Sequence, residues 1–148
     1  MKVSTKVQYG MLALTDIALY SGAGLSVSTP DIAERQHISR KYLEQILTHL
    51  KQAGLIHAQK GLRGGYSLSR PAEKISIAEI LDALDNSILE GPEAPWAGEE
   101  NSLRQAVDAC LWEEMNNTLV RFAQGKTLAE CMQECRERLA GEWDMYVI

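Results

Sequence analysis

The segment SRKYLEQILTHLKQAGLIHAQKGLRGGYSLSR, residues 39–70, joins an amphipathic helical pattern to a glycine-rich loop. Ser39 suits the N-cap of a helix, and Gly54 suits its C-terminal end. Two short extended runs flank the loop, which predicts a β-hairpin. The helix carries apolar residues at the i, i+3, i+4 and i+7 spacing of one buried face. These residues are Leu43, Ile46, Leu47 and Leu50.

Two helical patterns precede this segment. Residues 5–21 repeat apolar side chains at spacings of three and four, and Gly22 follows them. Thr29 suits the next N-cap, Pro30 suits the first helical position, and this short helix should end near His37. A helix, a helix–turn–helix and a hairpin in this order predict a winged helix.

The rest of the chain predicts helices on either side of one linker. Residues 75–85 form a short amphipathic pattern, which completes a DNA-binding domain over residues 1–85. Residues 86–100 contain two prolines, two glycines and four glutamates, which predict a mobile linker. Residues 101–148 are the expected dimerisation or regulatory part. The predicted fold class is mainly α with a small β-hairpin, a winged helix-turn-helix plus a long dimerisation helix.

The last part should contain two helices. A long pattern from Asn101 to about residue 124 is expected to be capped by Gly125. A capping box from Thr127 to Glu130 begins the final helix, which Gly141 is expected to end.

Apolar residues of the long helix spread over roughly 200° of its circumference, wider than the ~100° stripe of a helix packed on one side. We therefore expect one flank to pack on its own domain and the other to pack on a second copy in a homodimer. The candidate dimerisation residues are Leu103, Val107, Leu111, Trp112, Met115, Leu119 and Phe122, with Cys110 and Thr118 on the same arc.

Charge is distributed unevenly along the chain, whose net charge is −5. Residues 1–74 carry ten Lys/Arg and five Asp/Glu, whereas residues 75–148 carry five Lys/Arg and fifteen Asp/Glu. This asymmetry favours a polyanionic partner for the first half, although scattered surface charge is the alternative. The three cysteines fit a reducing compartment, and no apolar run predicts a signal peptide or a membrane span. We therefore expect a cytoplasmic protein that does not bind membranes.

The polar face of the helix that follows Ser39 carries the side chains that read DNA in a helix–turn–helix. Arginine and lysine suit guanine, glutamine suits adenine, and glutamate suits the cytosine amino group. Tyr42, at the edge of the apolar stripe, can reach a phosphate. The alternative is an ordinary exposed polar face. The candidate residues are Ser39, Arg40, Lys41, Glu44 and Gln45, with Thr48 beside them.

The glycine-rich loop adds two cations, Lys60 and Arg63. Glycine removes side chains that would hold the backbone away from a duplex, and an arginine at the tip can enter a narrow minor groove. A plain hairpin turn would need the glycines but not the cations. The loop lacks the Lys-Ser/Thr pair of a nucleotide-binding P-loop. Helix face and loop together favour double-stranded DNA as the ligand.

Four stretches, KVSTKVQYGMLAL, ISRKYLEQIL, GGYSLSRP and ISIAEILDALD, resemble in order and spacing the Rrf-two family of bacterial winged-helix regulators. The resemblance covers residues 1–86 closely and the long helix more loosely. It implies a sequence-specific regulator, most often a repressor. It also implies base or backbone contacts at Ser39, Lys41, Tyr42 and Glu44, a wing cation at Lys60, and phosphate contacts at Lys2, Thr5 and Tyr9.

The chain departs from the cluster-binding members of that family, which keep three cysteines in the linker. Residues 86–100 contain none. Cys110 lies in the long helix, and Cys131 and Cys135 lie four residues apart in the last one. These three cysteines are packing residues, a thiol sensor or part of a metal site. We predict no metal and no cofactor, and a redox-sensing regulator remains the alternative.

The C-terminal region resembles the family's cysteine-metabolism repressors, which implies a role in cysteine or sulfur metabolism and cysteine synthase as a partner. Tyr146, Val147 and Ile148 would be the handle for that partner. The alternative is that this tail docks on its own subunit or on a second copy. No nucleophile–base pair is visible, so an enzyme is not predicted. A protein-interaction module without specific DNA binding is the other alternative.

Because the linker has no cysteine, we expect anaerobically purified protein to hold no iron–sulfur cluster in the family manner. Its ultraviolet–visible spectrum should lack cluster absorption. Stoichiometric iron and sulfide would contradict this, and the three cysteines named above would then be the ligands to replace.

Overall fold

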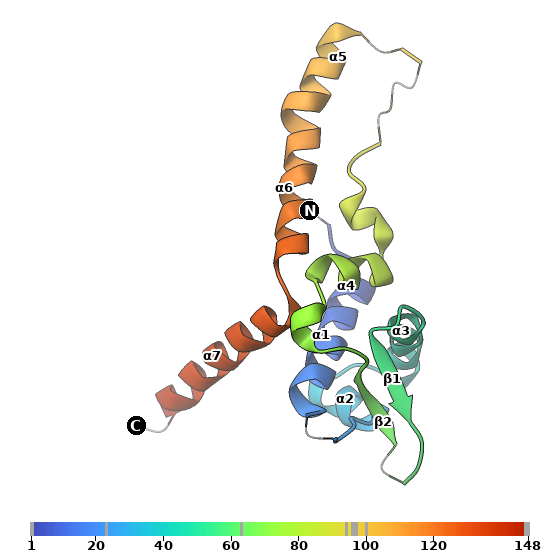
Figure 1. The fold of residues 1–148 in the computed structure, drawn as a ribbon, viewed down its shortest axis with the longest axis vertical. Helices are drawn as coiled ribbons and strands as arrows, with labels where there is room; N and C mark the ends of the chain where they lie inside the picture. The colour runs from blue at the N-terminus through green and yellow to red at the C-terminus, as the bar shows by residue number, and fades with distance from the viewer. Residues whose placement is uncertain are drawn as a thin grey trace.

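Four helices and a two-stranded hairpin form the N-terminal body of the protein, from which a long helix rises (Figure 1). The structure is a computed structural model, and it describes residues 2–22, 24–62, 64–93, 95, 98–99 and 101–146, with side chains up to residue 142. The mainly helical winged-helix fold predicted from the sequence is confirmed. The elements in order are α1 Thr5–Tyr20, α2 Thr29–Gln36, α3 Arg40–Gln52, β1 Ile56–Gln59, β2 Gly65–Leu68, η1 Ala72–Lys74, α4 Ile77–Leu84, η2 Asn86–Leu89, α5 Ser102–Val107, η3 Asp108–Trp112, α6 Glu113–Gly125 and α7 Leu128–Tyr146.

The core of the body is centred on α3. All four residues of its apolar stripe are buried, with at most 1% of their surface exposed. They belong to one hydrophobic cluster with Leu14 and Ile17 of α1, Ile32 of α2 and Ile80 of α4. Since three helices cover one face of α3, only its opposite face can meet a ligand.

Serine side chains begin the helices of this body. Ser39 is the N-cap of α3, as the sequence predicts, and its Oγ accepts a hydrogen bond from the Tyr42 N–H (3.3 Å). The predicted N-cap of α2 is wrong by one residue, because Ser28 rather than Thr29 has the extended conformation and accepts from the Asp31 N–H. Pro30 consequently occupies the second helical position.

The hairpin pairs β1 with β2 in antiparallel register, and it gains a further contact at its base. Val27 forms an isolated bridge with Tyr66, in which each N–H donates to the other carbonyl (2.9 and 2.8 Å). A Cβ atom on Gly65 would lie 2.5 Å from the Val27 carbonyl oxygen, so this close approach requires glycine. The chain before α2 therefore fixes the position of the hairpin.

A buried carboxylate joins α1 to α2. The side chain of Asp16 is fully buried and accepts two hydrogen bonds from the Arg35 guanidinium, at 2.9 and 2.8 Å. Gln36 donates a third, at 2.8 Å, and the Arg35 guanidinium lies 4.3 Å from the centre of the Tyr20 ring. This hydrogen bonding raises the pKa of Arg35. A buried charge is tolerated only with such partners.

The segment expected as a mobile linker begins as part of the folded structure. Residues 86–89 form η2, and Ile88 and Leu89 pack against the core. Asn116 of α6 donates a hydrogen bond to the Leu89 carbonyl (3.3 Å), and Gly91 adopts a positive φ close to that amide. Residues 94, 96, 97 and 100 lie outside the described residues.

The expected long helix is present, but it contains a π-helical turn, η3, between α5 and α6. The predicted role of Gly125 as the cap is wrong. Gly125 is the last helical residue, and Lys126 caps the helix in an extended conformation that needs no glycine.

The capping box of the last helix is confirmed, since the Glu130 N–H donates to Thr127 Oγ1 and the Thr127 N–H donates to Glu130 Oε2 (3.2 and 3.3 Å). The predicted end at Gly141 is wrong, because α7 continues to Tyr146. One helical glycine costs only about 1 kcal/mol, and strong helix formers precede this one. Figure 1 shows α7 projecting away from the body. No helix among the described residues is long and apolar enough to cross a membrane.

We expect Asp16→Ala to lower the free energy of unfolding by about 2–4 kcal/mol, because it leaves the Arg35 charge without its buried partner. Glu79→Ala is the matched control, since it removes the half-exposed ion pair with Arg70 and should cost less than about 1 kcal/mol. Urea unfolding measures both. Equal losses would show that Asp16 does not hold the two helices together.

Candidate DNA-binding surface

The exposed face of α3 carries the side chains expected from the sequence. Each of them is exposed except Tyr42, which is half-buried. Arg40, Lys41 and Glu44 make no side-chain hydrogen bond or ion pair within the described part of the chain. Their charged ends are therefore available to a ligand. The exposed residues are Ser39, Arg40, Lys41, Glu44, Gln45 and Thr48.

Two of these polar side chains already have backbone partners. Ser39 Oγ accepts from the Tyr42 N–H, and Thr48 Oγ1 donates to the Glu44 carbonyl (2.8 Å). These bonds hold the two hydroxyl groups in fixed positions at the first and third turns of the helix. The free cations lie between them.

Tyr42 and Tyr9 connect the exposed face of α3 to α1. Their rings meet edge to face, with centroids 6.0 Å apart and an interplanar angle of 76°. This packing holds both phenol groups on one side of the body. The structure thus brings together two of the predicted DNA-contact residues from different helices.

The N-terminus of α1 places the other predicted phosphate contacts. Thr5 is the first residue of α1, whose N-cap is Ser4, and it is exposed. Lys2 is exposed too, but it borders a hollow of about 630 Å³ beside Asp85 of the α4–η2 turn and Trp112 of the long helix. Lys2 therefore lies beside the long helix.

Two arginines among residues 1–74 already form ion pairs within the chain. Arg35 forms an ion pair with Asp16, and Arg70 forms one with Glu79. The hydrogen bond from Arg70 lowers the pKa of Glu79. Among the described residues, Arg40, Lys41 and Lys60 are predicted DNA-contact cations of the helix and hairpin that form no ion pair within the chain. The sequence total for residues 1–74 overstates the charge that a ligand can meet.

The hairpin loop presents Lys60 as an exposed cation. Arg63, predicted to enter the minor groove, lies outside the described residues. The sequence analysis missed Leu62, whose side chain is fully exposed at the hairpin end. A leucine between glycine and arginine is visible in the sequence, but only the structure shows that no other described element covers it.

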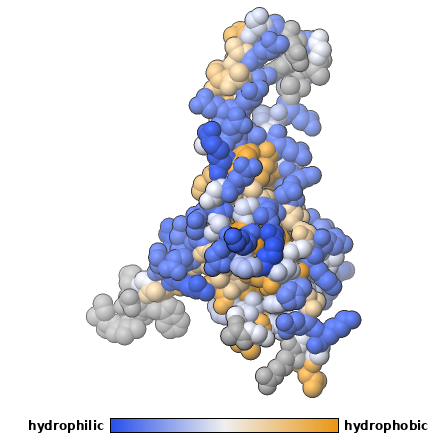
Figure 2. All heavy atoms as spheres, in the orientation of Figure 1, coloured by the Kyte–Doolittle hydropathy of each residue, from blue (hydrophilic) through white to orange (hydrophobic). Residues whose placement is uncertain are grey.

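The predicted dimerisation face is exposed along the long helix. Leu103 is 73% exposed, Met115 59% and Phe122 58%, while Val107 and Leu119 are half-buried. Figure 2 shows hydrophobic colour interrupting the polar surface of this helix. An open groove of about 720 Å³ runs along it, lined by Cys110, Leu111, Glu114, Met115, Thr118, Leu119 and Phe122.

The cysteines are in two separate places. Cys110 is exposed in the groove of the long helix, whereas Cys131 and Cys135 are half-buried on α7. Burial raises the pKa of the Cys131 thiol, which lowers the fraction of reactive thiolate. Cys131 also packs against the core, which supports a packing role for it.

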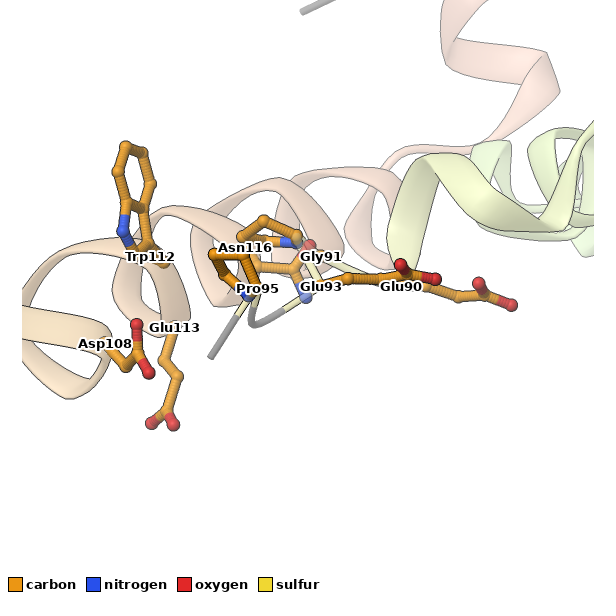
Figure 3. Close-up of a pocket in the computed structure, with 9 residues that line it drawn as sticks. Glu90, Gly91, Glu93, Pro95, Asp108, Trp112, Glu113 and Asn116 are labelled. Carbon is orange, nitrogen blue, oxygen red and sulfur yellow. The ribbon is translucent and has the colours of Figure 1, made fainter. Parts of the chain in front are cut away.

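A second hollow, of about 500 Å³, separates the linker from the long helix (Figure 3). Trp112 and Asn116 line it from the helix, and Pro92 and Pro95 line it from the linker. It also has four carboxylates, from Glu90, Glu93, Asp108 and Glu113. No cysteine or histidine is among its lining residues.

Taken together, a helix–turn–helix packed on the core, an exposed cationic face on its second helix and a cation-bearing hairpin define a winged-helix DNA-binding protein. The chain belongs to the Rrf2 (Rrf-two) family, described as iron-dependent transcriptional regulators, whose family model matches residues 3–134. DNA-binding transcription regulation is thus the function class of the family.

The similar proteins include both IscR and CymR regulators. The transcriptional regulator IscR of Cereibacter sphaeroides is 38% identical to this chain. The matched region covers 90% of this chain and 88% of that IscR. The structure of CymR, the global cysteine regulator of B. subtilis, has a TM-score of 0.77 at 28% identity and covers 90% of this chain and 98% of CymR. T. potens IscR has a TM-score of 0.74 at 33% identity and covers 93% of this chain and 90% of its own.

The donor groups of this chain do not fit an iron–sulfur cluster held by the linker. The described residues contain no group of three or more His, Cys, Asp or Glu side chains that could hold a metal ion. The hollow next to the linker offers carboxylates and an indole instead of thiols. Cofactor-free function remains a prediction from the sequence.

Proposed function

We propose that the protein is a sequence-specific transcription regulator that binds an inverted-repeat operator as a homodimer. One observation carries the proposal. Arg40 and Lys41 have no partner within the described part of the chain, and they lie on the exposed face of a helix whose opposite face is fully buried. Because that helix is the second of a helix–turn–helix, its free face suits the major groove.

The proposed contacts divide into base readout and positioning. Arg40 and Lys41 suit guanine, Gln45 suits adenine, and Glu44 suits the cytosine amino group. The backbone contacts fix orientation but carry no sequence information. The proposed positioning residues are Lys2, Thr5, Tyr9, Ser39, Tyr42, Lys60 and Arg63.

The proposed homodimer uses the groove along the long helix. Large apolar side chains in water favour association, and roughly 25 cal/mol is gained for each Å² buried. A twofold axis through this face would place two recognition helices on half-sites about one helical turn or more apart. Repression follows if the operator overlaps a promoter, since a bound dimer occupies the DNA that the polymerase needs. Such a regulator would act in the cytoplasm.

Control by the cysteine supply is a finer proposal. It is supported by the structural similarity to CymR, whereas the higher sequence identity to IscR does not support it. The expected partner contact at Tyr146–Ile148 loses part of its basis, because α7 continues to Tyr146 and leaves no seven-residue free tail. Residues 147 and 148 lie outside the described residues, so the cysteine synthase contact stays a prediction.

We expect Lys41→Ala to change the preference for one base position by about 1–3 kcal/mol, since it removes a base contact. Lys60→Ala should instead weaken binding to all sequences and reduce the salt slope by about one. Binding titrations on duplexes selected by the wild-type protein, at several salt concentrations, measure both effects. Equal affinity of the wild-type protein for all duplexes would contradict sequence-specific regulation.

We expect Met115→Glu to convert the dimer to a monomer at micromolar concentration, because the charge would be buried without a partner. Gln133→Glu on α7 is the matched control for charge, since Gln133 is exposed outside the groove. Sedimentation equilibrium gives the mass. A wild-type monomer, or an unchanged mass for Met115→Glu, would show that the groove is not the dimer interface.

A further inference from the structure

Two cysteines share one face of α7. Cys131 and Cys135 are four residues apart within this helix, so their side chains are neighbours on adjacent turns, with Cβ atoms about 5–6 Å apart. Both are half-buried, whereas Cys110 is exposed in the groove of the long helix. The helix α7 thus carries a pair of thiols that solvent can reach.

The first of these thiols has a fixed position. The start of α7 is attached to the body, since the Leu128 N–H donates to the Ile75 carbonyl (2.8 Å) and the Ile77 N–H donates to the Lys126 carbonyl (2.9 Å). Figure 1 shows this end of α7 beside the body and the other end projecting away from it. Cys131 follows in the first turn of α7 and packs against the core. Its sulfur is therefore held in place before any ligand arrives.

Packing explains only one of the two thiols. Cys131 is among the residues that pack against the core, but Cys135 is not. Lys126 and Glu134 form an ion pair at this end of α7, with 2.9 Å between Nζ and Oε2. Burial raises the pKa of the Cys131 thiol, the Lys126 ammonium opposes that rise, and Cys135 adds to it. The two thiols therefore interact electrostatically, and the core does not explain why both are present.

The geometry of the helix disfavours a disulfide between them. A disulfide needs Cβ atoms about 3.5–4.5 Å apart, which is less than the separation of about 5–6 Å on facing turns of a helix. Closing the bond would distort α7 where it is attached to the body. A metal ion can fill the gap instead. Two metal–thiolate bonds of about 2.3 Å on opposite sides of one ion place the sulfurs about 4.6 Å apart.

The number of ligands decides which ion fits. Within the part of the chain that the structure describes, no group of three or more His, Cys, Asp or Glu side chains could hold a metal ion. Structural zinc takes four ligands, and most iron–sulfur clusters take four cysteines. Soft thiolates select Cu(I), which binds two of them in a line. The cysteine pair therefore suits a soft ion that needs only two ligands.

We infer that Cys131 and Cys135 form a two-thiolate site for Cu(I). On binding, the S–H bond of each cysteine breaks, one S–Cu bond forms at each sulfur, and two protons pass to solvent. The oxidation states of copper and sulfur do not change. The complex carries one net negative charge, and Lys126 is the nearby cation. This site lies on α7, apart from the proposed DNA-contact residues, and it does not depend on DNA binding.

Anaerobic titration of the reduced full-length protein with Cu(I), in competition with a colorimetric Cu(I) chelator, tests the site. We expect one Cu(I) per chain. Cys131→Ser and Cys135→Ser should each weaken binding by about a hundredfold or more, because a single sulfur does not chelate. The double variant should bind no more weakly than either single variant, since the pair acts as a unit. Cys110→Ser is the matched control and should bind Cu(I) like the wild-type protein.

A second variant separates the spacing of the thiols from their number. Gln133 is exposed on α7, and its position lies about 200° around the helix from Cys131. Gln133→Cys combined with Cys135→Ser keeps three cysteines but moves the second thiol off the shared face. This variant should bind as weakly as Cys135→Ser alone, and X-ray absorption of the wild-type complex should show two sulfur neighbours. Restored affinity in the moved-thiol variant, lost affinity in Cys110→Ser, or a copper shell without two sulfurs would overturn the inference.

Discussion

Burial of one face of α3 is the constraint on which the rest of the structure depends. Four side chains of α3 are removed from water by α1, α2 and α4, and each such burial is worth roughly 1.5–3 kcal/mol. A rotation of α3 about its axis would expose this stripe and bury Arg40 and Lys41. The same packing that stabilises the domain therefore fixes the side chains that can meet DNA. Folding and recognition are two consequences of one amphipathic helix.

Polar contacts then orient the elements around that core. The Asp16–Arg35 pair joins α1 to α2 where a purely apolar contact would permit sliding, since a buried charge tolerates only one arrangement of its partners. The Val27–Tyr66 bridge attaches the hairpin to the strand-like segment before α2. Backbone bonds from Ile75 and Lys126 attach α7 to the start of α4, because the Leu128 and Ile77 N–H groups donate across that junction. The DNA-binding surface is thus held by contacts outside it.

The acidic second half has its own physical role. Its charge lies largely on the linker and the outer faces of the last helices, away from α3. This separation keeps the carboxylates away from the negatively charged phosphates of a duplex. The chain as a whole still carries a clear net negative charge. The hollow between linker and long helix, with carboxylates and Trp112, shows that the linker of this chain carries donor chemistry different from that of thiol-ligated clusters.

Local patterns in the sequence determined the helices, the hairpin and the free face of α3. Ser39 as an N-cap, the stripe from Leu43 to Leu50, and the Thr127–Glu130 capping box depend on interactions within one or two turns, which the sequence displays directly. Helix ends were less well determined. Ser28 and Thr29 are both good caps, and Gly141 is a weak breaker whose effect depends on its neighbours.

Contacts between distant residues were decided only by the tertiary structure. Three such contacts join segments that have no common sequence pattern. They are the ion pair of Asp16 with Arg35, the ion pair of Arg70 with Glu79, and the packing of η2 against α6. The exposure of Leu62 is of the same kind, since an apolar residue in a loop is covered or uncovered by elements elsewhere in the chain. Periodicity encodes which face of a helix is apolar, but the partner of that face is encoded only by packing in three dimensions.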